Sequence, residues 1–243
     1  MEIHKPKPSH NWREFLVELG TITLGVLIAL AAEQTAQTLH NRSRAAEARA
    51  NIRAEIAQNL GLMNWREDTE ACQARRMTEV DGLIAASSAG KLPQEVLWIG
   101  QPVAGHMADG RYKAALQSGA LTLFDAAEQE VYANLYGAFA THDNALDGEL
   151  QAWADLRTLE DHPNASATLD WQLRSAMKRA RQARWALDLN RALSLRQAAQ
   201  IGVQPTPMKH TSTPSLCMPL HTPRAEAIKN LGNGSGNDTS RFP

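Results

Sequence analysis

The sequence predicts an all-α protein with an N-terminal transmembrane helix, a helical stalk, an antiparallel helical bundle and an irregular C-terminal tail. Three observations support this prediction. Apolar residues recur at helical spacing over long runs that lack proline and glycine. Residues that favour helices, such as alanine, leucine, glutamine, arginine and glutamate, are abundant, whereas β-branched residues are sparse. One apolar stretch, residues 15–32, is long enough to cross a bilayer.

Length and charge set limits on the function. The chain of 243 residues is long enough for one or two domains with a core. Its formal net charge of −1 favours neither nucleic acid nor an acidic surface as a partner. We expect five segments: a cytoplasmic N-terminus (1–14), a transmembrane helix (15–32), a periplasmic helical domain (33–202), an extended Pro-rich tail (203–231) and a disordered C-terminus (232–243).

The predicted transmembrane segment carries only one charged residue, Glu18. At 1.5 Å per residue, its 18 residues span about 27 Å, the thickness of a bilayer core. Three basic residues precede it and two follow soon after: Lys5, Lys7 and Arg13, then Arg42 and Arg44. Because positive residues tend to stay in the cytoplasm, this bias favours a cytoplasmic N-terminus. We expect a single-pass protein of the bacterial inner membrane, with its bulk in the periplasm.

A cleaved signal peptide is the main alternative, since Ala29, Leu30 and Ala31 fit the small-x-small cleavage pattern. The long polar region before the segment and the helical pattern that continues past it favour an uncleaved anchor. Either outcome places the residues after about 33 on the same side of the membrane. A buried helix of a soluble protein is a third interpretation, disfavoured by the length of the apolar run.

On a helical wheel, small and polar residues of this segment share one face: Glu18, Thr21, Gly25, Ala29, Ala32 and Ala36. Small residues let helices approach closely, and a polar group in lipid needs a partner. We therefore expect this face to bind a second copy or a partner membrane helix. Alternatively, the Glu18 side chain reaches the lipid headgroups and the small residues have no partner.

Four short stretches of the N-terminal region carry a family resemblance: HKPKP (4–8), NWREFL (11–16), GTI (20–22) and LGVLIALAAEQ (24–34). They resemble the start of an uncharacterised family of bacterial single-pass inner-membrane proteins. A looser similarity covers YANLYG (132–137) and a cysteine near the C-terminus. The dense match covers about 35 residues, and the family has no assigned activity. The resemblance therefore implies a membrane topology and adds no chemistry.

Residues 33–89 predict one helix or a bent pair, with a bend at Gly61. Its apolar positions recur at helical spacing: Leu39, Ile52, Ile56, Leu60, Met63, Met77, Val80 and Ile84. A partner helix must cover this stripe, as in a coiled coil. Residues 90–110 predict a loop with one helical turn starting at Pro93. Residues 111–117 predict a short helix that ends at Ser118 and Gly119.

Two long helices are predicted next, over residues 126–160 and 168–201. Asp125 and Glu128 form a capping box at the first, and His-Pro-Asn (162–164) ends it. Gly202 is the expected C-terminal cap of the second. The short link between them predicts antiparallel packing.

The first of these helices is acidic and the second basic, so we expect their opposite charges to face each other. A basic helix that carries Trp171 and Trp185 also suggests nucleic-acid binding. The predicted location outside the cytoplasm disfavours that interpretation. So does the acidic helix, which is an available partner within the chain. We therefore expect no nucleic acid among the partners.

Cys72 lies on an early predicted helix and Cys217 lies in the tail. In an oxidising compartment, a disulfide between them would attach the tail to the helical body. Two unpaired cysteines or an intermolecular bridge are the alternatives.

No pattern in the sequence indicates a catalytic or metal site. His142, Asp143 and Asp147 might suggest a metal cluster, but neighbouring residues do not share a helix face and no second histidine follows at i+4. We expect His142 to be a hydrogen-bonded histidine between helices; His106 with Asp109 is no stronger a candidate. The motifs HExxH, GxSxG, GxxxxGK[ST] and GxGxxG do not occur. We therefore expect no metal and no cofactor.

Five aromatic residues, at helical spacing or close to it, either line a ligand cavity or form core: Tyr112, Tyr132, Tyr136, Phe139 and Trp153. Core packing is the favoured interpretation. The function that the sequence favours is that of a membrane-anchored envelope protein of structural or interaction type. A periplasmic sensor or small-molecule binding module is the alternative, and an enzyme with a site outside known motifs comes third.

Overall fold

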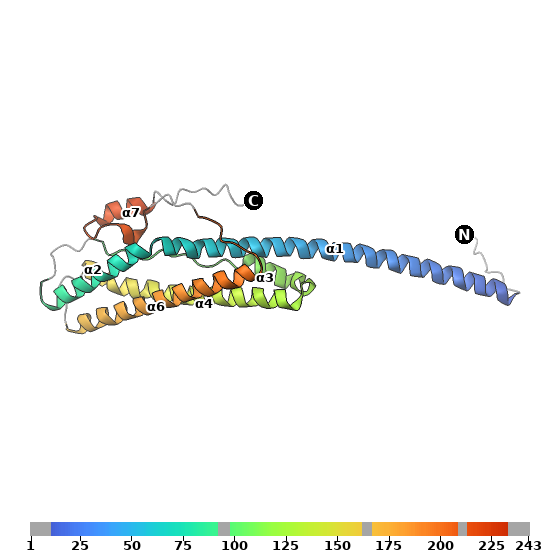
Figure 1. Ribbon diagram of the computed structural model, residues 1–243, viewed down its shortest axis with the longest axis horizontal. Coiled ribbons are helices and arrows are strands. Elements are labelled where there is room, and N and C mark those ends of the chain that lie inside the picture. The colour runs from blue at the N-terminus through green and yellow to red at the C-terminus, as the bar shows by residue number, and fades with distance from the viewer. Residues whose placement is uncertain (1–10, 92–97, 162–166, 209–212, 233–243) are drawn as a thin grey trace, which may run out of the picture.

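The computed structural model of the protein describes residues 11–91, 98–161, 167–208 and 213–232. Within these ranges the structure is helical and contains no strand, which confirms the predicted fold class (Figure 1). The elements are α1 (Trp12–Asp68), α2 (Glu70–Ser88), α3 (Gly110–Gln117), η1 (Ala120–Leu123), α4 (Ala126–Leu156), α5 (Thr158–Asp161), α6 (Ala167–Gln200), η2 (Ser215–Cys217) and α7 (Arg224–Gly232).

Helix α1 is a single helix of 57 residues, about 86 Å long. Its N-terminal half projects beyond the bundle (Figure 1). Every residue from 11 to 40 is exposed, and Ala45 is the first residue of the helix to be buried. The predicted membrane segment and the predicted stalk are therefore one continuous helix, because no proline interrupts it.

The predicted bend at Gly61 is wrong, because the chain breaks at Thr69, between α1 and α2. There the Thr69 hydroxyl donates to the carbonyl oxygen of Arg66 at 2.7 Å. Gly61 serves another purpose. A Cβ atom at Gly61 would clash with the carbonyl oxygen of Thr206. The N–H of Thr206 donates to the carbonyl oxygen of Ala57 at 2.8 Å, which holds the tail against α1. Glycine at this position lets the tail cross α1 in close contact.

Helices α4 and α6 pack against each other in antiparallel orientation along much of their length, as predicted (Figure 1). The Asp125 side chain accepts the N–H of Glu128 at 2.8 Å and caps α4. The predicted single helix to residue 160 is interrupted, because α4 ends at Leu156 and α5 begins at Thr158. The predicted stop at 162–164 and the helical turn at Pro93 lie outside the described residues.

The C-terminal cap of α6 agrees with the prediction. Gly202 has a φ of 66°, in the left-handed region that favours glycine. The N–H of Gly202 donates to the carbonyl of Ala199 at 3.1 Å, and the N–H of Val203 donates to that of Ala198 at 3.0 Å. This pair of bonds is the Schellman arrangement, so a local signal fixed the end of the helix to within one residue.

The prediction of an extended tail over residues 203–231 is wrong in its second half. Residues 203–208 lack helix, but α7 begins at Arg224, directly after Pro223. Alanine, glutamate, isoleucine and lysine then favour helix. Ala227 is fully buried against Trp98 and Met218. Contact with the body thus stabilises a short helix, which the Pro-rich composition of the tail did not predict.

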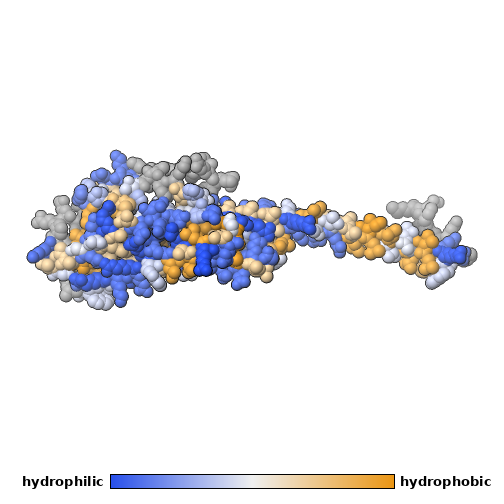
Figure 2. Space-filling view, in the orientation of Figure 1, coloured by the Kyte–Doolittle hydropathy of each residue, from blue (hydrophilic) through white to orange (hydrophobic). Residues whose placement is uncertain are grey.

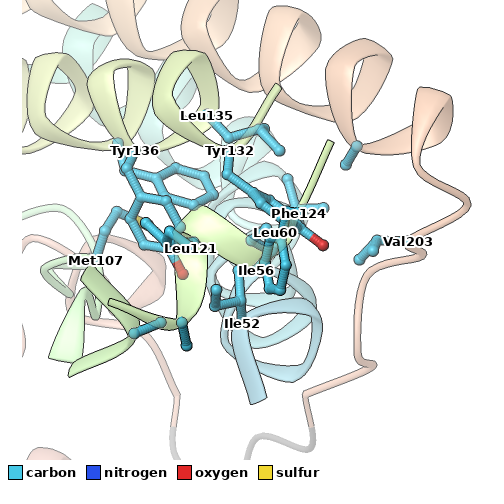
Figure 3. Close-up of a cluster of buried hydrophobic side chains, with 14 of the residues drawn as sticks. Ile52, Ile56, Leu60, Met107, Leu121, Phe124, Tyr132, Leu135, Tyr136 and Val203 are labelled. Carbon is cyan, nitrogen blue, oxygen red and sulfur yellow. The ribbon is translucent and has the colours of Figure 1, made fainter. Parts of the chain in front are cut away.

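Two apolar cores lie one after the other along the bundle. The first joins α1, α3, η1, the N-terminal half of α4 and the end of α6 around Ile52, Ile56 and Leu60 (Figure 3). The second joins α2, the C-terminal end of α4, the start of α6 and η2 around Val80 and Trp153. The segments between the two cores carry buried polar side chains.

The prediction that the acidic and basic helices face each other through their charges is largely wrong. Arg179 of α6 pairs with Asp155 of α4 at 2.5 Å. Three other arginines of α6 pair with carboxylates of α1 and α2: Arg181 with Asp81, Arg184 with Glu70, and Arg191 with Glu67. Apolar side chains fill the interface between α4 and α6, so most of these charges lie at its edges.

Candidate functional site

The predicted association face lies on the projecting half of α1. Its residues are all exposed: Glu18, Thr21, Gly25, Ala29 and Ala32. The Thr21 hydroxyl donates to the carbonyl of Val17 at 2.8 Å, within its own helix. A Cβ atom at Gly25 would meet no atom within 4 Å. Since no described residue of the bundle packs on this face, a substitution at Gly25 tests contacts with another molecule only.

One helix among the described residues, α1, is long and apolar enough to cross a membrane. None of its most apolar 18-residue stretch is buried in the protein. The space-filling view shows this stretch as an apolar band on the projecting half of α1 (Figure 2). Large side chains such as Val17 and Ile28 are more than half exposed there. An apolar surface of this kind is unfavourable in water and needs lipid or protein around it.

The predicted pairing of the two cysteines is confirmed. The sulfur atoms of Cys72 and Cys217 lie 2.06 Å apart and their Cα atoms 4.9 Å apart. The bond joins α2 to η2, across 145 positions of the sequence. It therefore attaches the tail to the helical body, as the sequence predicts.

Arg76 makes a second link between the tail and the body, which sequence reasoning missed. Its side chain is fully buried, and its Nη1 donates to the carbonyl oxygen of Trp98 at 2.9 Å and to that of Ile99. Its Nη2 donates to the carbonyl oxygen of Met218, and its Nε donates to Glu79 at 2.7 Å. Burial lowers the pKa of Arg76, against the effect of the Glu79 carboxylate. One guanidinium thus joins α2, the 98–99 segment and the tail.

A buried ion pair lies between the two apolar cores. Glu149 of α4 is fully buried, and its Oε1 accepts from Arg66 at 2.7 Å and from Gln73 at 2.6 Å. Its Oε2 has no hydrogen-bond partner among the described residues. Burial raises the pKa of Glu149, although Arg66 opposes this. The pair connects the junction of α1 and α2 to α4.

His142 and His106 both lie near Asp143. His142 is buried, and its Nδ1 lies 3.6 Å from Asp143. His106 lies 3.8 Å from Asp143 through Nδ1 and 3.6 Å from Asp147 through Nε2. Asp143 also accepts the N–H of Met107 at 3.0 Å, which fixes the preceding loop. Within the described ranges, no group of three or more His, Cys, Asp or Glu residues is arranged to hold a metal ion.

We expect His142 to make stability depend on pH. Burial lowers the pKa of His142, although Asp143 opposes this. The unfolded chain takes up a proton on this residue near pH 6.5, whereas the folded protein takes it up only at a lower pH. Lowering the pH from about 7.5 to 5.5 therefore destabilises the fold, by up to about 1.4 kcal/mol per pH unit from this residue.

Thermal unfolding of the full chain in detergent, measured over that pH range, checks this expectation. His142→Leu should show a shallower loss of stability towards acid pH than the wild type. His40→Gln, at an exposed position on α1, is the matched control and should behave as the wild type. Equal slopes for His142→Leu and the wild type would contradict the assignment.

A second group that sequence reasoning missed caps α3. The buried carboxylate of Glu55 accepts the N–H groups of Arg111 at 2.8 Å and Tyr112 at 3.2 Å. It also accepts the hydroxyl of Tyr136 at 2.6 Å. The first N–H groups of a helix lack internal partners and attract negative charge. Glu55 thereby fixes the start of α3 against α1. Asp109, just before this helix, pairs with Lys113 of α3 at 2.6 Å rather than with a histidine.

The aromatic residues form core rather than a ligand cavity. Tyr132, Tyr136, Phe139 and Trp153 are all buried. Figure 3 shows Tyr132 and Tyr136 within the first core. Tyr112 stacks on Tyr136 with ring centroids 4.1 Å apart. These aromatic side chains pack against other side chains of the protein, so they form core and do not line a ligand cavity.

Two surface grooves border the exposed tryptophans of α6. One of about 330 Å³ lies beside Trp171, and another of about 420 Å³ lies beside Trp185, against α2. The Trp185 groove is also lined by Arg181 and Arg184, which already pair with carboxylates of α2. The positive charge available to an external phosphate is therefore reduced on this face.

Comparison of the chain with protein-family models, with curated proteins and with solved structures found no significant match.

Proposed function

We propose that this chain is an envelope protein anchored in the bacterial inner membrane by residues 15–32, whose helical domain acts by binding other protein. The observation that carries the proposal is the exposed apolar half of α1. Over about 27 Å its apolar side chains have no cover from the described residues of the chain. Lipid supplies that cover and matches this length.

The disulfide supports a location of the domain outside the cytoplasm. Bonds of this kind persist in oxidising compartments and are rare in the cytosol. Cys72 and Cys217 both lie beyond the anchor in the sequence, so one crossing places both in the periplasm. The excess of basic residues before the anchor favours the same orientation, with the N-terminus in the cytoplasm.

An interaction role is supported by the shape of α1. About 12 residues, most of them exposed, separate the anchor from Ala45, so the stalk holds the domain about 18 Å from the end of the anchor. The same helix then forms part of the bundle. A helix that continues through Ala31 into the stalk also fits an anchor that is retained rather than cleaved. The small-residue face of the anchor is the proposed contact for a second copy or a partner helix.

Fractionation of bacteria that express the full chain with an N-terminal epitope tag tests the proposal. We expect the tagged chain in the membrane pellet after carbonate extraction, and digestion of its bulk when protease is added to spheroplasts. Leu24→Arg combined with Leu27→Arg should abolish membrane retention, while the exposed stalk substitution Gln37→Arg should not. An intact chain in the soluble cytosol would refute the proposal, and a soluble periplasmic domain without its tag would refute the retained anchor.

A further inference from the structure

We propose that two copies of this chain pair in parallel through α1, along a seam that begins in the membrane and ends near Ala50. The inference rests on the proposed function, because two anchors that insert in the same direction place their α1 helices parallel. It names the partner that the proposed function leaves open, which is a second copy of this chain.

The seam consists of exposed residues spaced alternately by three and four positions: Ala32, Ala36, Leu39, Ser43, Ala46 and Ala50. This spacing keeps one face of each helix towards its partner in a two-stranded coiled coil. Leu39 is 60% exposed, whereas the other apolar residues of the predicted stripe are buried. Gly25 and Ala29 continue the same spacing into the anchor, giving a seam of about 38 Å.

The bundle leaves this face of α1 uncovered up to about Ala50 and covers it beyond that point. The domain packs on another side of α1, through Ala45, Ile52 and Ile56. At the next seam position, the guanidinium of Arg53 donates to the carbonyl oxygen of Ile201 at the end of α6. A second helix can therefore lie along α1 up to about Ala50. Beyond that point, the end of α6 contacts this face of α1 through Arg53.

Charges beside the seam select a second copy as the occupant. Arg42 precedes Ser43 in the seam, and Glu47 follows Ala46. In a parallel coiled coil these flanking positions face each other, so Arg42 of each copy meets Glu47 of the other. Both side chains are exposed, and neither has an ion pair within the part of the chain that the structure describes. Five positions apart, they do not face each other on one helix.

One added cysteine per variant, in the full-length chain that keeps its Cys72–Cys217 bond, tests the pairing in native membranes. Ala36→Cys and Ser43→Cys lie in the seam, while Gln37→Cys and Thr38→Cys are exposed controls on the same stalk. After brief oxidation and thiol quenching, we expect a band of twice the monomer mass for the seam variants only, on non-reducing gels. Equal cross-linking at all four positions, or none at any, would overturn the proposal, as would a seam adduct with a different protein.

A charge exchange tests the register. In the Ala36→Cys background, Arg42→Glu or Glu47→Arg should each lower the yield of dimer about fivefold, the effect of two exposed ion pairs on association. The combined exchange restores the opposite charges and should restore the yield. A combined variant as weak as the single ones would overturn the parallel, in-register pairing.

Carbonate extraction of the same membranes separates the two proposals. A chain that is absent from the membrane pellet refutes the anchor itself. A chain that is retained in the pellet but shows no seam-dependent dimer refutes only the pairing.

Discussion

Replacement of Arg66 by methionine should destabilise the domain by about 3–5 kcal/mol, because it leaves the carboxylate of Glu149 buried without its cation. Glu149 is fully buried and receives its closest charged contact from Arg66, at 2.7 Å. Methionine keeps much of the side-chain volume, so the loss reports on charge rather than on a cavity. Thermal or urea unfolding of the full chain in detergent, followed by circular dichroism, measures the change.

A double variant provides the control for this prediction. Arg66→Met combined with Glu149→Leu removes both charges, and apolar replacement of a whole buried pair is often close to neutral. We therefore expect the double variant to recover most of the lost stability. Arg174→Met removes an exposed pair with Asp170 and should change little. If Arg66→Met is as stable as the wild type, the pair does not have the role assigned to it.

Removal of the disulfide should have the second large effect. Closing a loop of 145 residues stabilises the fold by about 5 kcal/mol in the chain-entropy model, as an upper estimate. The variant with Cys72→Ala and Cys217→Ala should unfold at correspondingly lower urea concentration. Arg76 still binds the carbonyl oxygen of Met218 in this variant, so the tail should stay docked at equilibrium.

Limited proteolysis of the same variant tests how the tail is held. We expect faster cleavage in residues 203–223 than in the wild type, and a similar increase when the wild type is treated with a reductant. The matched control is Arg75→Gln, since Arg75 donates to the carbonyl oxygen of Cys217 at 3.1 Å from an exposed position. Unchanged stability and unchanged cleavage on reduction would contradict the role of the bond.

Elements fixed by local interactions could be predicted from the sequence. The start of α4 depends on Asp125 and the end of α6 on Gly202, and both are set by residues within a few positions. The bend could not be predicted, because the role of Gly61 is set by Thr206, far away in the sequence. The charges of α6 also gave a wrong prediction of its charged partners, since α1 and α2, and not only α4, supply the carboxylates.

The buried polar groups had a weak signal that sequence reasoning passed over. Glu55 and Asn59 lie at helical spacing among Ile52, Ile56 and Leu60, on the face that the core buries. A charged or amide side chain in such a stripe indicates a hydrogen-bonded partner on another element. The identity of that partner depends on tertiary packing. The sequence could mark Glu55 as unusual but could not connect it to the start of α3.

The uninterrupted length of α1 has a mechanical consequence. In the proposed topology, the helix runs about 54 Å from the end of the anchor to Asp68, so a tilt of the anchor at the membrane surface moves the far end of the helix. A change of about 10° in the tilt of the anchor would sweep the far end through roughly 9 Å. In that topology, a change in bilayer thickness that the anchor accommodates by tilting would change how far apart the two domains of the proposed pair stand.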